Sequence, residues 1–272
     1  MIDLHTHTTA SDGRCSPDEL AARAASAGVT TLGLTDHDTV AGCAATGDAC
    51  ARLGIAFIPG IEITAVAQER DVHVLAYFFD PGSLSLHTFL AEQRVRRVER
   101  VREMFARLEA HGIDLDADAI LAPGLADPAR AVGRPWIARA LVERGLVADV
   151  NEAFVRWLGR GCPAFVPRSG ASPSEVIGII HAAGGVASLA HPVLVQHDEW
   201  IPELADAGLD ALEAFHPDHS ADDTSRYLGL AADLGLLVTG GSDYHGDADH
   251  GGGGPGTVNL PPEHFERLLA RC

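Results

Sequence analysis

The chain contains no lysine, so arginine carries all of its permanent positive side-chain charge. Its 272 residues include 20 basic and 38 acidic side chains, which gives a formal net charge of −18. A surface this acidic repels phosphate backbones and anionic lipid headgroups. We therefore expect neither duplex nucleic acid nor a membrane surface as a partner. An arginine-lined pocket for a small anionic substrate remains compatible with this charge.

Paired thiols and long apolar runs are also missing. The five cysteines, at positions 15, 43, 50, 162 and 272, show no CxxC spacing. No apolar stretch approaches the roughly 20 residues that a membrane helix needs. The N-terminus begins with the strand-like Ile2-Asp3-Leu4-His5 and lacks the basic-then-apolar pattern of a signal peptide. We therefore expect reduced thiols and a cytoplasmic protein.

Short apolar runs alternate with longer helical patterns along most of the chain, and 46% of the residues are hydrophobic. We predict strands over 2–5, 31–35, 56–63, 71–78, 186–190, 209–214 and 237–241. We predict helices over 17–27, 40–53, 84–110, 173–183, 219–235 and 262–270. This alternation is typical of βαβ units and a mainly parallel sheet. Seven strands favour a closed or nearly closed α/β barrel.

The alternation breaks between residues 99 and 166, where only helical patterns occur, at 113–121, 135–144 and 150–158. We interpret 99–166 as a helical insertion that caps the barrel mouth, with the catalytic barrel formed by 1–98 and 167–272. An ordinary extra helical layer is the alternative. The arginines of 94–107 are expected to form a solvated face, with one or two free to turn toward a phosphate.

Imidazoles and carboxylates gather in strings that are far apart in the sequence but mostly follow predicted strands. They are His5, His7, Asp12, His37, Glu62, His73, His191, Asp243 and His245. Catalytic groups of α/β barrels sit at the C-terminal ends of the strands, so these nine side chains are expected to meet. A ligand set without thiolates suits Mn²⁺, Zn²⁺ or Fe²⁺, and nine ligands imply about two or three ions.

Other polar groups near these strings are expected to play supporting roles. Asp36 and Asp38 flank His37 and are predicted to orient or cap rather than to ligate. Glu213 ends the sixth predicted strand, where it could orient a ligand or simply be a core or rim acid. Among the remaining histidines, His216 is the best candidate for a functional role because it follows a strand end.

Six strings together resemble the PHP (polymerase and histidinol phosphatase) metal-dependent phosphoesterases. They are DLHTHTTASDG, TDHD, GIEIT, VHVLAY, LAHP and GSDYHG. The resemblance implies a distorted seven-stranded (β/α)7 barrel with a trinuclear centre, commonly of Mn²⁺, with Zn²⁺ or Fe²⁺ as alternatives.

The resemblance also implies how the ligands divide among the ions and where the nucleophile lies. The first ion would be held by His5, His7, Glu62 and Asp243. The second would be held by Glu62, His73 and His191. The third would be held by Asp12, His37 and His245. A metal-bridging hydroxide, held in place by Glu62, Asp243 and His191, would be the nucleophile.

The strings GRPWIARALVERG and FVRWLGRGCPAFVP resemble the insertion of the subgroup that hydrolyses nucleoside 3′,5′-bisphosphates and 5′-phosphorylated oligonucleotides. The arginine of that motif corresponds to Arg134, whose planar fork suits a phosphate. The subgroup has a histidine two residues later, where this chain has Trp136. An indole cannot carry charge, so it would either stack on a nucleobase or pack between insertion and barrel.

These observations favour a metal-dependent phosphatase that acts on a phosphorylated nucleotide, converting a nucleoside 3′,5′-bisphosphate into the nucleoside 5′-monophosphate. The first alternative is a 5′→3′ exonuclease on short 5′-phosphorylated RNA or DNA, using the same centre. Histidinol phosphatase activity is disfavoured by the helical insertion. A non-catalytic metal-binding domain is disfavoured because all nine candidate ligands are present.

Overall fold

The computed structural model describes residues 1–126, 132–246 and 253–271. Seven strands form one sheet whose spatial order follows the chain. They are β1 (Ile2–Asp3), β2 (Thr31–Leu34), β3 (Ala56–Ala67), β4 (Arg70–Tyr77), β5 (Val186–Leu189), β6 (Ala211–Phe215) and β7 (Leu237–Gly240). All seven predicted strands are confirmed.

The sheet curls so that its two outer strands meet. The amide of Leu4, just past β1, donates to the carbonyl of Gly240 at 3.2 Å, and the amide of His7 donates to the carbonyl of Tyr244 at 2.9 Å. The result is a nearly closed, distorted barrel, as predicted. Because the ends of β1 and β7 lie side by side, the residues that follow them share one mouth of the barrel.

One strand runs against the others. β4 pairs antiparallel with both β3 and β5, whereas the remaining neighbours pair in parallel. The turn between β3 and β4 is Gln68-Glu69, with φ of 48° and 61°. Two residues with positive φ make a tight hairpin and are far too few for a parallel crossover. β3 also continues four residues beyond its predicted end, so Glu62 lies within the strand rather than close to its end.

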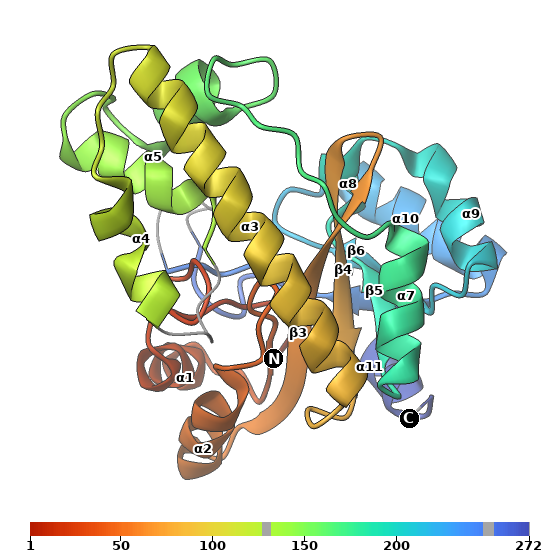
Figure 1. Ribbon diagram of the computed structural model, residues 1–272. Coiled ribbons are helices and arrows are strands. Elements are labelled where there is room, and N and C mark those ends of the chain that lie inside the picture. The colour runs from red at the N-terminus through yellow and green to blue at the C-terminus, as the bar shows by residue number, and fades with distance from the viewer. Residues whose placement is uncertain (127–131, 247–252, 272) are drawn as a thin grey trace.

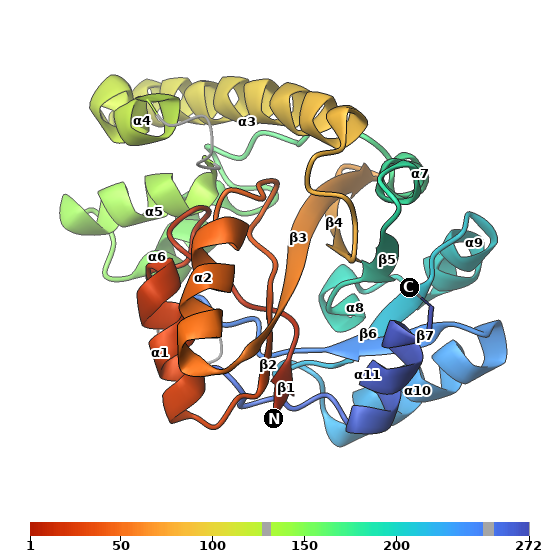
Figure 2. The same ribbon diagram turned by 90° about the horizontal axis from the view of Figure 1, so that it is seen from below.

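Helices cover the outside of the barrel, and the six predicted there are confirmed. They are α1 (Pro17–Ser26), α2 (Cys43–Leu53), α3 (Leu84–Ala110), α7 (Pro173–Ala182), α10 (Ala221–Leu234) and α11 (Pro262–Leu269). Figure 2 shows α1 and α2 on one side of the strands and α10 and α11 on the other. Ser16 and Ser172 begin α1 and α7 with capping boxes followed by proline.

Three short elements were not predicted because each is shorter than the window over which helical periodicity can be recognised. They are α8 (Pro192–Val195), the 3₁₀ turn η2 (Asp198–Trp200) and α9 (Ile201–Asp206). No helix among the described residues is long and apolar enough to cross a membrane. Four cysteines are free thiols, while Cys272 lies outside the described residues.

Between α3 and α7 the described residues form helices only, as expected. They are α4 (Ala117–Ala126), α5 (Arg134–Glu143), α6 (Val150–Ala153) and the π-helical turn η1 (Phe154–Leu158). In Figure 1 the long helix α3 runs from the barrel to the group formed by α4 and α5. Buried side chains from Val101 to Val166 pack into a cluster of their own, apart from the core beneath the sheet. The predicted boundary at residue 99 falls inside α3, so the two-part division stays a prediction.

Candidate metal centre

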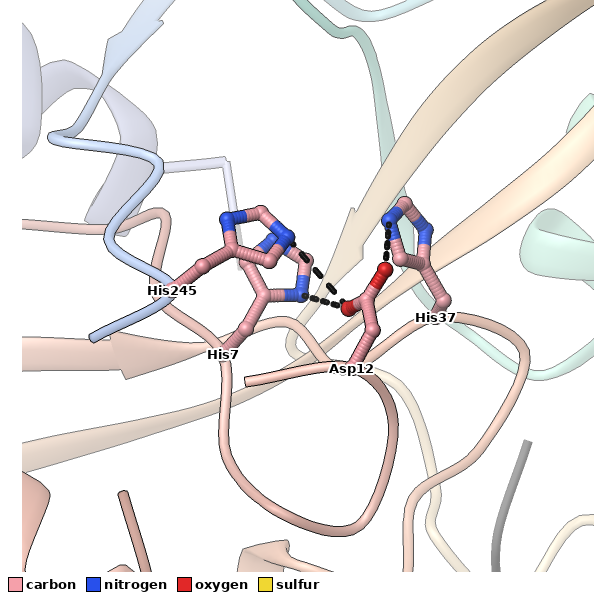
Figure 3. Close-up of side chains that lie close together, drawn as sticks. All are labelled: His7, Asp12, His37 and His245. Atoms are coloured by element: carbon pink, nitrogen blue, oxygen red, sulfur yellow. Dashed lines mark ion pairs between the residues drawn. The ribbon is translucent and has the colours of Figure 1, made fainter. Parts of the chain in front are cut away.

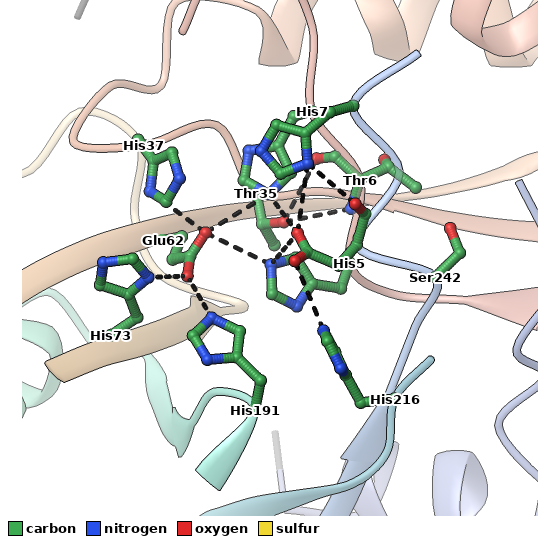
Figure 4. A network of polar contacts seen from close by, with 12 residues as sticks. His5, Thr6, His7, Thr35, His37, Glu62, His73, His191, His216 and Ser242 are labelled. Atoms are coloured by element: carbon green, nitrogen blue, oxygen red, sulfur yellow. Dashed lines mark hydrogen bonds and ion pairs between the residues drawn. The ribbon is translucent and has the colours of Figure 1, made fainter. Parts of the chain in front are cut away.

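The nine predicted ligands converge on the mouth of the barrel, although they come from six separate segments. Glu62, which is 1% exposed, lies in the middle of them (Figure 4). Its Oε1 lies 2.6 Å from Nδ1 of His73 and 3.0 Å from Nε2 of His191. This carboxylate therefore faces side chains from the antiparallel strand β4 and from the end of β5.

The other oxygen of Glu62 faces the beginning of the chain. Its Oε2 lies 3.3 Å from Nε2 of both His5 and His7, and 3.2 Å from Nδ1 of His37. Oδ1 of Asp243 lies 3.2 Å from the same nitrogen of His5 and 3.1 Å from that of His7. His5 and His7 lie two residues apart on an extended segment, so both rings point to one side. The ligand atoms of His5, His7, Glu62 and Asp243 all lie within 4.8 Å of one another.

A second group of ligand atoms gathers around Asp12 (Figure 3). Its Oδ1 lies 3.3 Å from Nε2 of His245 and 4.0 Å from Nδ1 of His7, and its Oδ2 lies 3.7 Å from Nε2 of His37. The ring of His7 stacks on that of His245 with 4.0 Å between centroids. His7 thus adjoins this group as well as the group around Asp243, which the sequence did not indicate.

His37 also belongs to two groups. Its Nδ1 faces Glu62, and together with His73 these residues form a third cluster of possible ligands. His191 lies next to this cluster, because its Nε2 also contacts Glu62. The three sets implied by the family resemblance therefore adjoin one another, with Glu62, His7 and His37 between them. Adjacent sites of this kind suit several ions held close together.

The donor atoms fit divalent metal ions. Within the described part of the chain, several buried ligand atoms make no hydrogen bond even though oxygen atoms lie close to them. They are both ring nitrogens of His7, Nδ1 of His37, Nδ1 of His73, and Oδ1 of Asp243. Buried polar atoms are almost always hydrogen-bonded, so a cluster of exceptions calls for another partner. Convergent imidazole and carboxylate donors are what Mn²⁺, Fe²⁺ and Zn²⁺ bind.

The electrostatics of the centre separate neutral from charged ligands. Burial lowers the pKa of His37 to about 3, which leaves its ring neutral and its lone pair available. Burial also lowers the pKa of His245, but Asp12 and Asp243 outweigh it and raise that pKa to about 10. Burial raises the pKa of Glu62, but the surrounding histidines, His37 first, outweigh it and hold that pKa well below its usual range. Glu62 is therefore ionised at neutral pH.

Two side chains, those of Asp36 and Arg139, hold the loop that carries Asp12. Asp36 accepts hydrogen bonds from the amide of Thr8 at 2.8 Å and from the hydroxyl of Ser11 at 2.7 Å, as expected of a supporting residue. Arg139 on α5 donates to the backbone carbonyl of Asp12 at 2.6 Å. The contact of Arg139 ties a helix of the all-helical region directly to a candidate metal ligand.

A cluster of arginines borders the centre. Arg97 donates to Asp38, the residue after His37, and Arg168 lies 3.7 Å from the same carboxylate. Arg134 lies 3.1 Å and Arg168 3.4 Å from the carboxylate of Asp71. Asp38 also accepts the amide of Thr64 at 2.8 Å, so it supports β3 rather than serving as a ligand.

The charges in this cluster are crowded. Burial and the charge of Arg168 lower the pKa of Arg100 to about 9, and burial and Arg97 lower that of Arg168 to about 10. Burial raises the pKa of Asp71, but Arg168 and Arg134 outweigh it and hold it far below its usual range. The guanidinium groups of Arg97, Arg134 and Arg168 contact the two carboxylates of Asp38 and Asp71, and Arg100 adds a fourth positive charge nearby. The excess positive charge suits an anionic ligand.

Arg134 and Trp136 lie at the start of α5, outside the group of metal ligands. Side chains two residues apart on a helix do not face the same side. The guanidinium of Arg134 lies toward Asp71, whereas the indole ring of Trp136 lies against α4, where a Cβ added at Gly124 would be 3.2 Å from it. This geometry favours packing over substrate contact for Trp136, and its role stays a prediction.

Sequence reasoning did not foresee Arg168 or Arg139, because nothing in their local sequence differs from that of surface arginines. Glu213 and His216 could be singled out from the sequence, because Glu213 lies near the end of the sixth predicted strand and His216 comes shortly after it. His216 lies with its Nε2 3.4 Å from Oδ2 of Asp243. Glu213 is completely buried behind His5.

The chain is similar to known proteins over nearly its whole length. The PHP-domain model matches residues 3–121. A 3′,5′-nucleoside bisphosphate phosphatase of Chromobacterium violaceum is 35% identical over 268 residues, covering 96% of this chain and 93% of that protein. The 5′-3′ exoribonuclease Rnm of Escherichia coli is 35% identical over 254 residues, covering 90% and 85%. A crystal structure from Bifidobacterium adolescentis, described as a metal-dependent phosphoesterase, aligns with a TM-score of 0.89 at 33% identity, covering 99% and 95%.

Proposed function

Because this chain belongs to the PHP-domain family and is a metal-dependent phosphoesterase, we propose that its substrate is a nucleoside 3′,5′-bisphosphate. Hydrolysis of the 3′-phosphate would give the nucleoside 5′-monophosphate and phosphate. The observation that carries this proposal is the arginine cluster beside the candidate metal centre. A substrate with one phosphate would leave that cluster without an anion to bind.

The spacing of the two sites supports a substrate with two phosphates on one sugar. Asp71 contacts Arg134 and Arg168, and His73 contacts Glu62 in the centre. Both lie on β4, two residues apart, so they point to the same face about 7 Å from each other. The 3′- and 5′-phosphates of a nucleotide are separated by a single ribose, a distance of the same order.

We propose that two or three divalent ions, Mn²⁺ in preference to Zn²⁺ or Fe²⁺, occupy the centre. The residues that would hold them are His5, His7, Asp12, His37, Glu62, His73, His191, Asp243 and His245. Bound ions of this kind lower the pKa of a water molecule toward neutrality and offset the charge that develops on the phosphoryl oxygens. Elemental analysis of Mn²⁺-loaded protein should find two to three ions per chain, and a ceiling of one ion with full activity would contradict this.

The chain's own residues then bind and orient the substrate. Arg134, which is 26% exposed on its side chain, would turn its free donors toward the non-reacting 5′-phosphate while Asp71 holds its other edge. Arg168, buried beside it, would add charge without moving. Asp38 and Asp71 keep both guanidinium groups in place before substrate arrives, so less side-chain entropy is lost on binding.

A 5′→3′ exonuclease on short 5′-phosphorylated RNA or DNA is the second candidate, because the Escherichia coli exoribonuclease is also 35% identical, over 254 residues against 268 for the phosphatase. The same arginines would then receive the 5′-phosphate at the end of a chain. The net charge of −18 disfavours long polyanions, because each further nucleotide adds repulsion.

The test is hydrolysis of four substrates at equal concentration by purified Mn²⁺-loaded protein, measured as phosphate release for the monoesters and as release of nucleoside 5′-monophosphate for the oligonucleotide. The substrates are a nucleoside 3′,5′-bisphosphate, a nucleoside 3′-monophosphate, histidinol phosphate and a 5′-phosphorylated trinucleotide. We expect the highest kcat/KM on the bisphosphate, and an Asp243→Asn variant supplies the background. A higher kcat/KM on the trinucleotide would establish the exonuclease instead, and preference for histidinol phosphate would reject both.

A further inference from the structure

A carboxylate with no exposed surface lies behind the metal centre, in the middle of β6. Oε1 of Glu213 lies 2.9 Å from Nδ1 of His5, and its Oε2 accepts the backbone amide of His191 at 2.7 Å. Both the glutamate and the ring of His5 are 0% exposed. We infer that Glu213 is a positioning residue that sets the tautomer of His5 and the backbone of His191, and thereby the affinity for two of the ions.

The tautomer of His5 follows from the chemistry of its two neighbours. An ionised carboxylate only accepts hydrogen bonds, so Nδ1 of His5 must be the donor. A ring that binds a metal ion must be neutral, and its lone pair is then on Nε2. That nitrogen lies 3.3 Å from Oε2 of Glu62 and 3.2 Å from Oδ1 of Asp243, inside the group of candidate ligands. Glu213 thus points the lone pair of His5 at the ion that Glu62 and Asp243 would share.

The second contact acts on the backbone. His191 has φ of 25°, a conformation that side chains rarely adopt, directly after β5 and before Pro192. The proline disfavours the α region for His191, so the local sequence allows few conformations there. Its amide is held by Glu213, while its Nε2 lies 3.0 Å from Oε1 of Glu62. The carboxylate of Glu213 therefore supports two candidate ligands, His5 and His191, which contact different oxygens of Glu62.

The same residues could instead form a metal site, because His5, Glu213 and His216 also lie within 4.8 Å of one another. An ion there would take Nδ1 of His5 while Nε2 serves the ion beside Glu62. His5 would then have to lose both ring protons and bridge two ions. A hydrogen bond needs no such deprotonation, so we assign Glu213 to support rather than to ligation. The two possibilities differ in the number of ions bound.

Substitution of Glu213 by glutamine tests the tautomer directly. The amide of His191 still needs an acceptor, so the glutamine oxygen would face it and the NH₂ group would face Nδ1 of His5. Nδ1 then accepts, the proton moves to Nε2, and His5 no longer offers a lone pair to the ion. Loss of such an outer partner lowers metal affinity about 10- to 100-fold. Glu213→Asp keeps an acceptor-only group and should retain more of the affinity.

Asp210 provides a matched control. It makes the same two kinds of contact, with Nε2 of His181 at 2.8 Å and the amide of Ala187 at 2.9 Å, but none of its contacts involves a candidate ligand. Asp210→Asn should therefore disturb a carboxylate–histidine pair between α7 and the residue before β6 without changing metal binding.

The experiment measures Mn²⁺ content by elemental analysis after equilibration at defined free Mn²⁺, for wild type, Glu213→Gln, Glu213→Asp and Asp210→Asn. We expect Glu213→Gln to need about 10- to 100-fold more Mn²⁺ for two of the ions, with the ion at Asp12, His37 and His245 unaffected. Wild-type affinity in Glu213→Gln, or an equal loss in Glu213→Asp and Glu213→Gln, would overturn the inference.

Further outcomes separate this inference from the proposed function on which it rests. A fourth ion in wild type that disappears in Glu213→Gln would make Glu213 a ligand and overturn the supporting role. Wild-type protein that binds no Mn²⁺ would refute the proposed metal centre itself. If Glu213→Gln does not fold, a second measurement uses wild-type protein loaded with diamagnetic Zn²⁺. The nitrogen-15 spectrum of the His5 ring then shows which ring nitrogen carries the proton. A proton on Nδ1 supports the inference, and a bare Nδ1 overturns it.

Discussion

Replacement of Arg134 tests whether the arginine cluster binds the phosphate that does not react. The guanidinium lies 3.1 Å from Asp71, with 26% of its side chain exposed and able to reach an incoming anion. A hydrogen bond to a charged group contributes about 1.5–3 kcal/mol, and 1.4 kcal/mol corresponds to a factor of ten. The remaining guanidinium groups of Arg97, Arg100 and Arg168 would keep part of the attraction, so the lower half of that range applies.

We therefore expect Arg134→Ala to raise KM for a nucleoside 3′,5′-bisphosphate about 10- to 30-fold. KM for the matching 3′-monophosphate should change less than about threefold, because that substrate has no second phosphate to lose. Arg134→Lys should fall between, since an ammonium keeps the charge but not the planar fork. The assay is steady-state phosphate release with both substrates, side by side.

Two controls make the result interpretable. The guanidinium carbon of Arg134 also lies 5.4 Å from the ring centre of Phe154, so its removal could loosen α5. Arg134→Met keeps an apolar stem on that ring, and its melting temperature shows whether packing is preserved. Arg156→Ala removes an exposed arginine of the same region and should change neither KM. An equal rise of KM on both substrates, or none on the bisphosphate, would remove Arg134 from this role.

Four further perturbations test other parts of the argument. Asp243→Asn keeps the shape of a ligand but not its charge, so kcat should fall about 10²-fold or more, and activity within threefold of wild type would mean that Asp243 is not a ligand. Metal affinity should rise about tenfold per pH unit between pH 7 and 9, because the pKa of His245 is about 10 and its proton must leave before metal binds. A flat profile in a chelator competition assay would contradict that. Trp136→His should lower the melting temperature. It should not change the ratio between kcat/KM for a nucleoside bisphosphate and kcat/KM for the matching base-free sugar bisphosphate, and a changed ratio would mean that the indole contacts the base. Gly241→Ala should destabilise the fold by about 1–3 kcal/mol in urea unfolding, because the new Cβ would lie 2.3 Å from the amide nitrogen of His5, while Gly178→Ala, with open space around it, should not.

The sequence alone predicted the barrel and the set of polar residues at its mouth. Seven apolar runs alternate with helical patterns, and periodicity of that kind depends only on neighbouring residues. His5 and His7 point to one side of an extended segment for the same local reason. His37, His191 and Asp243 follow strands, and strand ends of a barrel meet at one mouth. Convergence could therefore be expected before any distance was known.

The tertiary structure decided which of these groups touch. β4 runs antiparallel because the Gln68-Glu69 turn is tight, and this direction brings His73 to Glu62 and Asp71 to Arg134. Arg168 looks like any surface arginine in the sequence, and only packing buries it between two carboxylates from β4 and the loop after β2. Glu213 likewise becomes a partner of His5 through a contact across 208 positions of the chain. Such pairs depend on strand direction, register and long-range packing, which local sequence patterns do not encode.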